Sequence, residues 1–204
     1  MTIRPLTLDD IADQRAYERE RVGFRREVIA VKRRRRVSIG PVVTLTFENR
    51  LTMRFQVQEM ARAEKLITDS QIQRELDVYN RLLPAPGELS ATIFLELTSE
   101  EQLRNWLPRL VGIEGSVLLE IGEGTSRHLV RSVPEAEHET HLTRPEVTSA
   151  VHYVRFPFTS GAQAAFHIGP VRLVVDHAEY SEGWPGVAMS DASRAELSRD
   201  LAGD

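Results

Sequence analysis

The spacing of hydrophobic positions changes along the chain, and this change predicts where helices and strands lie. In the first part of the sequence, the later apolar residues recur at intervals of seven, four and three, which keeps them on one face of a helix. The apolar positions are Leu8, Ile11, Tyr17, Phe24, Val28 and Val31. We therefore expect a long amphipathic helix over residues 8–34, capped by Thr7 or Asp9.

Strict alternation replaces the helical spacing after residue 42. Val43, Leu45 and Phe47 alternate with polar residues. Apolar residues at 53, 55 and 57 do the same. A period of two is typical of half-buried strands. With Asn49-Arg50 as a tight turn, the pattern predicts a β-hairpin.

Helical spacing returns from Met60 to Ile67 and again from a cap at Asp69 or Ser70 to Pro84. The second half predicts mainly strands, at 91–97, 117–121, 128–133, 151–158 and 171–176, with a helix at 99–110 and an exposed loop at 134–147. Helices first and strands later indicate an α+β fold with a mainly antiparallel sheet. We expect one domain over residues 1–180.

The C-terminal stretch, residues 181–204, is rich in small and acidic residues. It is predicted to be a poorly ordered tail, although residues 192–201 could form a turn or two of helix.

Composition narrows the class of protein. The chain has 204 residues, of which 41% are hydrophobic and 27% charged, with a net charge of −4. There is no cysteine, which excludes disulfides, thiolate metal sites and cysteine nucleophiles. The charged N-terminus does not resemble a signal peptide, and no apolar run has the roughly 20 residues that span a bilayer. We expect a soluble cytoplasmic protein.

A basic block interrupts this acidic chain at Lys32, Arg33, Arg34, Arg35 and Arg36. It falls where the first helix is expected to end, and cations there interact favourably with the helix dipole. We expect an outward-facing, solvated helix end that could bind an acidic partner. Phosphate binding ranks lower, because no aromatic residue interleaves the block for base stacking.

A polar cleft is the best candidate for a ligand pocket. The expected hairpin and the two helices after it carry six polar side chains that could line it. They are Glu48, Asn49, Gln58, Glu59, Glu75 and Asn80.

Histidines are the residues on which a transition-metal site would depend, because cysteine is absent. His152 and His177 lie at ends of predicted strands that could be neighbours, and Glu179 lies close to the second. Two imidazoles and a carboxylate suffice for zinc or iron(II). The alternative is that each histidine donates a hydrogen bond to a backbone carbonyl. His138 and His141, in the acidic loop, are expected to be solvated.

Four phrases, KRRRRV-x-x-GP, TLTFEN, QVQEM and GELSAT, make the chain resemble DUF3501, a bacterial family of unknown function, over residues 5–180. The resemblance implies no catalytic residue. It implies genes adjacent to those of a rubrerythrin-like protein and an iron–sulfur oxidoreductase, and hence a role in peroxide defence.

Three functions stay open. The first is an accessory protein that docks onto such a redox partner through Lys32–Arg36, with no cofactor of its own. The second is a small metal- or ligand-dependent enzyme that uses His152 and His177 or the polar cleft; no catalytic motif supports it. Nucleic-acid binding through the arginines ranks last, and homodimerisation is open.

Overall fold

The computed structural model describes residues 4–135 and 146–203, and within these residues the strands form two antiparallel sheets. In spatial order, the larger sheet contains β1 (Arg36–Ile39), β2 (Val43–Glu48), β3 (Glu88–Leu95), β7 (Val151–Pro157) and β6 (Val133–Pro134). The smaller sheet contains β5 (His128–Arg131), β4 (Val117–Ile121), β8 (Val171–Val175) and β9 (Val187–Ala188). The predicted α+β class is confirmed.

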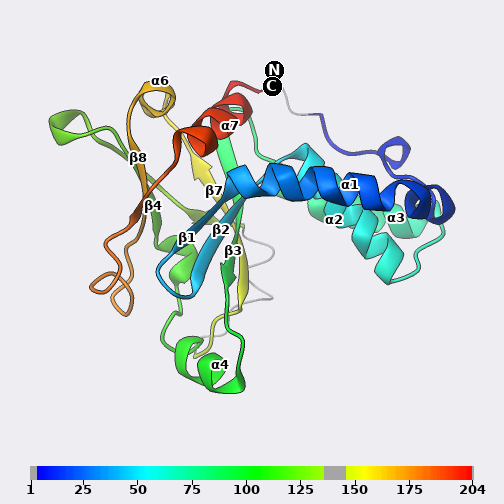
Figure 1. Ribbon diagram of the computed structural model, residues 1–204, viewed down its shortest axis with the longest axis horizontal. Helices are drawn as coiled ribbons and strands as arrows, with labels where there is room; N and C mark the ends of the chain where they lie inside the picture. The colour runs from blue at the N-terminus through cyan, green and yellow to red at the C-terminus, as the bar shows by residue number, and fades with distance from the viewer. Residues whose placement is uncertain (1–3, 136–145, 204) are drawn as a thin grey trace.

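The helices lie around these sheets rather than in a separate layer. They are α1 (Gln14–Arg35), α2 (Arg50–Ala63), α3 (Asp69–Tyr79), α4 (Glu100–Trp106), α6 (Ser160–Ile168) and α7 (Asp191–Ala202). In Figure 1, α1, α2 and α3 extend away from the sheets on one side, and α7 lies near the end of α1 where the chain enters β1. No helix among the described residues is both long and apolar enough to cross a membrane.

The main hydrophobic core lies between the two sheets. It joins the inward side chains of both sheets to Phe166 of α6 and Leu197 of α7. A second cluster packs α2 and α3 against the N-terminal segment, and a third packs α1 against α2. In the third cluster Phe24 meets Phe55 edge to face, with ring centroids 5.6 Å apart. The two smaller clusters hold the three helices together, and the second also contacts Tyr153 of the larger sheet.

The predicted hairpin over 43–57 is wrong in its second half. β2 pairs with β1 on one side and β3 on the other, and residues 50–63 are helical. Asn49 caps α2, because its Oδ1 accepts the backbone N–H of Thr52 at 3.0 Å. Met53 and Val57 are four residues apart and share the buried face, while Phe55 packs against α1. Because α2 packs on two sides, its apolar residues at 53, 55 and 57 alternate with polar ones, as they would in a strand.

The first helix starts later than predicted. Residues 8–10 form a single 3-10 turn, which Thr7 and Asp10 close by capping each other. The chain then extends to Asp13, whose side chain accepts the Ala16 N–H and caps α1. The predicted start at residue 8 therefore merged two elements, and the predicted end at 34 differs from the observed end by one residue.

The stretch expected to be a poorly ordered tail contains a packed helix, α7, which includes residues 192–201, where the sequence also allowed a turn or two of helix. Ser190 caps α7, and Leu197 and Leu201, four residues apart on one face, are 0% and 5% exposed. Residues 187–202 thus complete the core instead of lying outside a domain that ends at 180.

Candidate functional site

The four consecutive arginines meet four different environments. Arg33 is exposed and has no hydrogen bond or ion pair with any described residue. Arg34 bonds through Nε to Glu196 at 3.2 Å, and Arg36, already in β1, pairs with Glu96. Arg35 is 1% exposed. The expectation of an outward-facing block is therefore wrong for Arg35, because the chain changes from helix to strand within the block.

The buried guanidinium of Arg35 joins three elements. Its Nε donates to the carbonyl of Phe47 at 3.0 Å, and Nη2 donates to the carbonyl of Glu48 at 3.4 Å. On the other side it pairs with Glu196 and Asp200 of α7. Burial raises the pKa of Asp200, and the positive charge of Arg35 opposes that shift. Arg35 is thus a structural cation that fixes the end of α1 to β2 and α7.

The outer face of α1 is different, because its cations have no partner among the described residues. Four of these arginines, Arg15, Arg19, Arg26 and Arg33, lie opposite the buried Tyr17, Phe24 and Val28, and a fifth, Arg25, lies on the flank of the helix. Between them Val22 is 68% and Ile29 41% exposed. A shallow hollow of about 300 Å³ lies on this face, lined by Arg21, Val22, Arg25, Arg26 and Ile29. We call this surface the outer face of α1.

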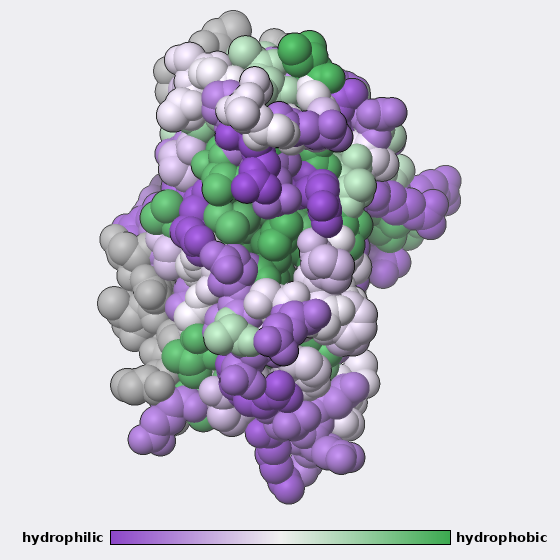
Figure 2. Space-filling view, turned by 90° about the vertical axis from the view of Figure 1, so that its left-hand side faces the viewer, coloured by the Kyte–Doolittle hydropathy of each residue, from purple (hydrophilic) through white to green (hydrophobic). Residues whose placement is uncertain are grey.

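Charge pairing sets this face apart from another exposed surface, the outer side of the smaller sheet. Leu118, Leu129 and Val174 lie on that side. Figure 2 looks onto this part of the molecule and shows apolar side chains among hydrophilic ones. The charges there neutralise each other in the pairs Arg127–Glu120 and Arg131–Asp176. On the outer face of α1, by contrast, no acid among the described residues pairs with Arg15, Arg19, Arg25, Arg26 or Arg33.

Two residues of the predicted polar cleft hold the N-terminal segment. The amide of Gln58 donates to the Ala12 carbonyl at 2.9 Å and accepts the Ala12 N–H at 3.0 Å. Asn80 makes the same pair of bonds with Leu6, at 2.9 and 2.7 Å. Each side-chain amide bonds both the backbone N–H and the carbonyl of one residue, as a neighbouring strand would do in a sheet. Their hydrogen-bonding groups are therefore occupied by the protein itself.

The carboxylates of the predicted cleft are dispersed. Glu59 accepts bonds of 2.7 Å from Arg21 and from the hydroxyl of Tyr17. The hydrogen bond from Arg21, followed by that from Tyr17, lowers the pKa of Glu59 to about 2. Burial, together with the nearby Glu64, raises the pKa of Glu75. With Asn49 serving as a helix cap, the six residues do not line one cavity.

Glu48 is a buried member of this set that keeps one carboxylate oxygen without a hydrogen bond to any described residue. It is 3% exposed on the polar face of the larger sheet, where Oε1 accepts the hydroxyl of Thr92 at 2.9 Å. Its Oε2 has no hydrogen-bond partner among the described residues. Tyr153 lies on the same face, and burial, with Tyr79 and Glu48 nearby, raises the pKa of that phenol to about 12. This oxygen can accept one further hydrogen bond from a bound molecule.

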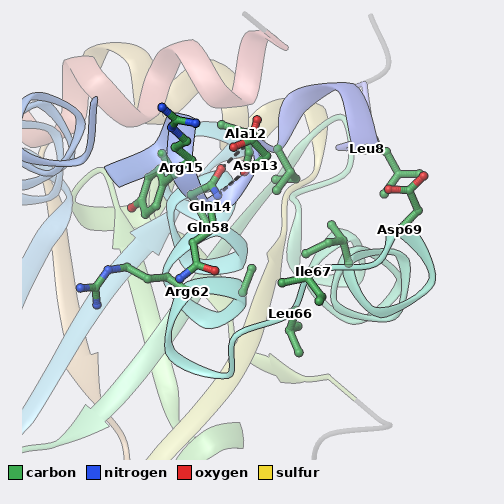
Figure 3. A pocket seen from close by; sticks show the side chains of 14 residues that line it. Leu8, Ala12, Asp13, Gln14, Arg15, Gln58, Arg62, Leu66, Ile67 and Asp69 are labelled. Atoms are coloured by element: carbon green, nitrogen blue, oxygen red, sulfur yellow. Dashed lines mark hydrogen bonds between the residues drawn. The ribbon is translucent and has the colours of Figure 1, made fainter. Parts of the chain in front are cut away.

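A separate hollow of about 270 Å³ opens between the start of α1 and the turn from α2 to α3 (Figure 3). Its apolar wall includes Ile11, Leu66 and Ile67, and Gln58 lies beside it. Lys65 adopts a left-handed conformation, with φ of 56°, so that the Leu66 N–H returns to the carbonyl of Ala61. No local sequence pattern predicts this hollow, because it depends on how that turn is oriented.

The histidine hypothesis rested on neighbouring strands, and that premise is wrong. His152 lies in β7 of the larger sheet, whereas His177 follows β8 of the smaller one. His152 Nδ1 is 3.8 Å from Oε2 of Glu114, which sequence reasoning missed, and His177 Nε2 is 3.0 Å from the carbonyl of Val111. Glu179 pairs with Arg109.

Metal ligands are not gathered in the described part of the chain. Among residues 4–135 and 146–203, no group of three or more His, Asp or Glu side chains could hold a metal ion. His138 and His141 lie outside the described residues, so the expectation that they are solvated stays a prediction.

Comparisons with known proteins identify relatives without naming an activity. A crystal structure described as a novel protein of unknown function from Burkholderia pseudomallei is 35% identical, with a TM-score of 0.87. The alignment covers 97% of this chain and all of that one. A comparison with curated proteins finds no match. The model of the family described as "Protein of unknown function (DUF3501)" matches residues 5–201, a span that includes most of α7. The chain therefore belongs to the DUF3501 family.

Proposed function

We propose that this protein is an accessory protein that binds an acidic surface of a partner protein through the outer face of α1. The observation that carries the proposal is the set of five arginines without partners among the described residues, arranged around exposed Val22 and Ile29. Arginine is enriched at protein interfaces, where acidic residues on the partner steer the encounter and fix its register.

The overall charge of the chain supports a local function for this face. The protein carries a net charge of −4, so the positive potential is confined to a part of the surface. The backbone beneath it is held in place by buried Tyr17, Phe24 and Val28. A rigid helix loses little conformational entropy when it binds, which favours recognition.

The partner we favour is a redox protein of the rubrerythrin-like or iron–sulfur oxidoreductase type. This choice rests on the gene neighbourhood that the family resemblance implies, and on the chemistry of the chain. A protein without cysteine cannot supply thiolates to an iron–sulfur cluster, so a redox role would come from its partner.

The structure determines how the test must be designed. Changing Arg33–Arg36 together would confound binding with stability, because Arg35 is buried. We would instead change Arg15, Arg19 and Arg26 to Ser and measure the affinity for the purified partner by biolayer interferometry. A matched control changes Arg104, Arg127 and Arg131 to Ser, which are exposed but paired with acids elsewhere.

We expect the outer-face variant to bind at least about tenfold more weakly, since a total loss of about 1.4 kcal/mol over the three substitutions is enough and arginine is enriched among interface residues with large individual contributions. The control variant should bind as the wild type does. Equal affinities for all three proteins would contradict docking through α1.

A second candidate function is binding of a small ligand, with or without catalysis, and the unpartnered Oε2 of Glu48 favours it. Native mass spectrometry of the purified protein tests this candidate. A bound mass that is present in the wild type and absent from Glu48→Gln would support it. Masses equal to the bare chain in both samples would count against it.

The metal version of this candidate, with His152, His177 and Glu179, is tested by metal analysis of protein purified without a histidine tag. It fails if no metal copurifies and if added zinc or iron(II) leaves the melting temperature unchanged.

A further inference from the structure

We infer that the element of the partner that lies on α1 is an acidic amphipathic α-helix. This inference rests on the proposed function and specifies its partner. It is argued from the spacing of the two exposed apolar residues, the position of the arginines around them and the hollow between them.

The apolar spacing favours a helix over an extended strand. Val22 and Ile29 are seven residues apart, which places them on one face of α1 about 10.5 Å apart along its axis. A partner helix repeats an apolar position every seven residues at the same distance. Same-side residues of a strand recur every 6.7 Å or so, giving about 7 and 13 Å, so they do not match this interval.

The arginines lie where a partner helix would carry its flanking acids. At about 100° per residue, Arg26 lies about 40° to one side of Val22 and Arg25 about 60° to the other. The hollow of about 300 Å³ is lined by these residues, Ile29 and the stem of Arg21. An apolar side chain of the partner would enter this hollow, and glutamates or aspartates beside it would meet the guanidinium groups. This arrangement has the form of a short coiled-coil seam.

The length of the basic stripe sets the length of the occupant. From Arg15 to Arg33 the outer face comprises 19 residues and is about 27 Å long. Nucleic acid is a poorer match, because the centre of the stripe is apolar and its described residues include no exposed aromatic side chain for stacking. A phosphate ligand would also make no use of the exposed apolar pair, Val22 and Ile29.

Two synthetic peptides of about 21 residues test the inference. One places Leu at the a and d positions and Glu at the flanking e and g positions of three heptads. The other has the same composition in an order that distributes Leu around the helix. Fluorescence anisotropy with the full chain should give an affinity at least about tenfold higher for the amphipathic peptide.

Substitutions locate the effect. Val22→Ser with Ile29→Ser should abolish the preference for the amphipathic peptide. The control Val78→Ser alters a side chain of α3 that, at 41%, is as exposed as Ile29, and it should preserve the preference.

Each failure has a distinct meaning. If both peptides bind equally and both lose affinity when Arg15, Arg19 and Arg26 become Ser, the helix inference is overturned and the acidic docking face stands. If neither peptide binds at low salt, the proposed function fails with it. Tighter binding of a DNA duplex of about 20 base pairs, or of vesicles containing phosphatidylserine, would overturn both in favour of those ligands.

Discussion

Arg33 and Arg35 are two residues apart in one run of arginines, yet they have opposite roles. Arg33 faces solvent without a partner among the described residues, whereas Arg35 is 1% exposed and bonds to β2 and α7. Local sequence hardly distinguishes them. The difference comes from α7, which brings Glu196 and Asp200 to the end of α1 from more than 160 residues away. A charged run is therefore best assigned residue by residue once its tertiary neighbours are known.

The largest effect should come from replacing Arg35. Arg35→Met leaves Asp200 buried without its cation and removes one of the partners of Glu196, which keeps Arg34. Breaking a buried ion pair in this way costs about 3–5 kcal/mol in the free energy of unfolding. Arg33→Met, on the exposed side, should change that free energy by no more than about 0.5 kcal/mol. Urea unfolding followed by circular dichroism measures both.

Arg35→Lys sharpens this comparison. A lysine keeps the charge but cannot donate to the two carbonyls and two carboxylates at once, so only part of the stability should return. Equal unfolding free energies for the variants at 33 and 35 would show that burial does not separate the two arginines.

The next effect concerns a buried polar side chain instead of a buried charge. Gln58→Ala leaves the N–H and carbonyl of Ala12 without their partner, which costs about 1–3 kcal/mol. The N-terminal segment should then be cut faster in limited proteolysis. The control is Gln73→Ala, because the Gln73 amide bonds to exposed Asp77 and to no other residue that the structure describes. If both variants are cut at the same rate, Gln58 does not hold the segment.

Loss of the half-buried ion pair between Arg21 and Glu59 should cost less free energy of unfolding than loss of Arg35 and more than loss of Arg33. This cost should depend on pH. The pKa of Glu59 is lowered to about 2, from a usual value of about 4.5, chiefly by Arg21. Its contribution to stability is therefore complete above about pH 5 and is lost as the pH falls toward 2. After allowance for solvent screening, the wild type should exceed Glu59→Gln by about 1–2 kcal/mol at pH 7.

Unfolding of both proteins between pH 2 and 7 measures this difference. It should shrink steadily below pH 5. A difference that does not vary with pH would mean that the ionised carboxylate is not what stabilises the contact.

The smallest effect should be a gain in stability at another basic residue near a helix end. Lys65 follows α2 with φ of 56°, a conformation that costs a side chain about 1 kcal/mol and costs glycine little. Lys65→Gly should therefore raise the free energy of unfolding by about 0.5–1 kcal/mol. A loss of stability would show that the lysine side chain makes a favourable contribution in this turn.

Prediction from sequence succeeded where one signal was unopposed. The hairpin over 117–121 and 128–133, and the short helix capped by Ser99, follow directly from alternation and capping. Prediction failed where two structures fit one pattern, as at Met53, Phe55 and Val57, since period two also suits a helix that is buried on two sides. The polar cleft failed for another reason, because its amides bind backbone groups of a distant segment.

The sequence by itself determined the composition of the surface and the existence of most elements: the amphipathic α1, the absence of thiol chemistry and the α+β class. Those properties depend on residue type and on short-range spacing, which act within a few residues. Only the tertiary structure decided which arginine is buried, that α7 completes the core and that His152 and His177 belong to different sheets. These outcomes depend on contacts between segments far apart in the chain, and their free energy arises only when the two sheets and α7 pack together.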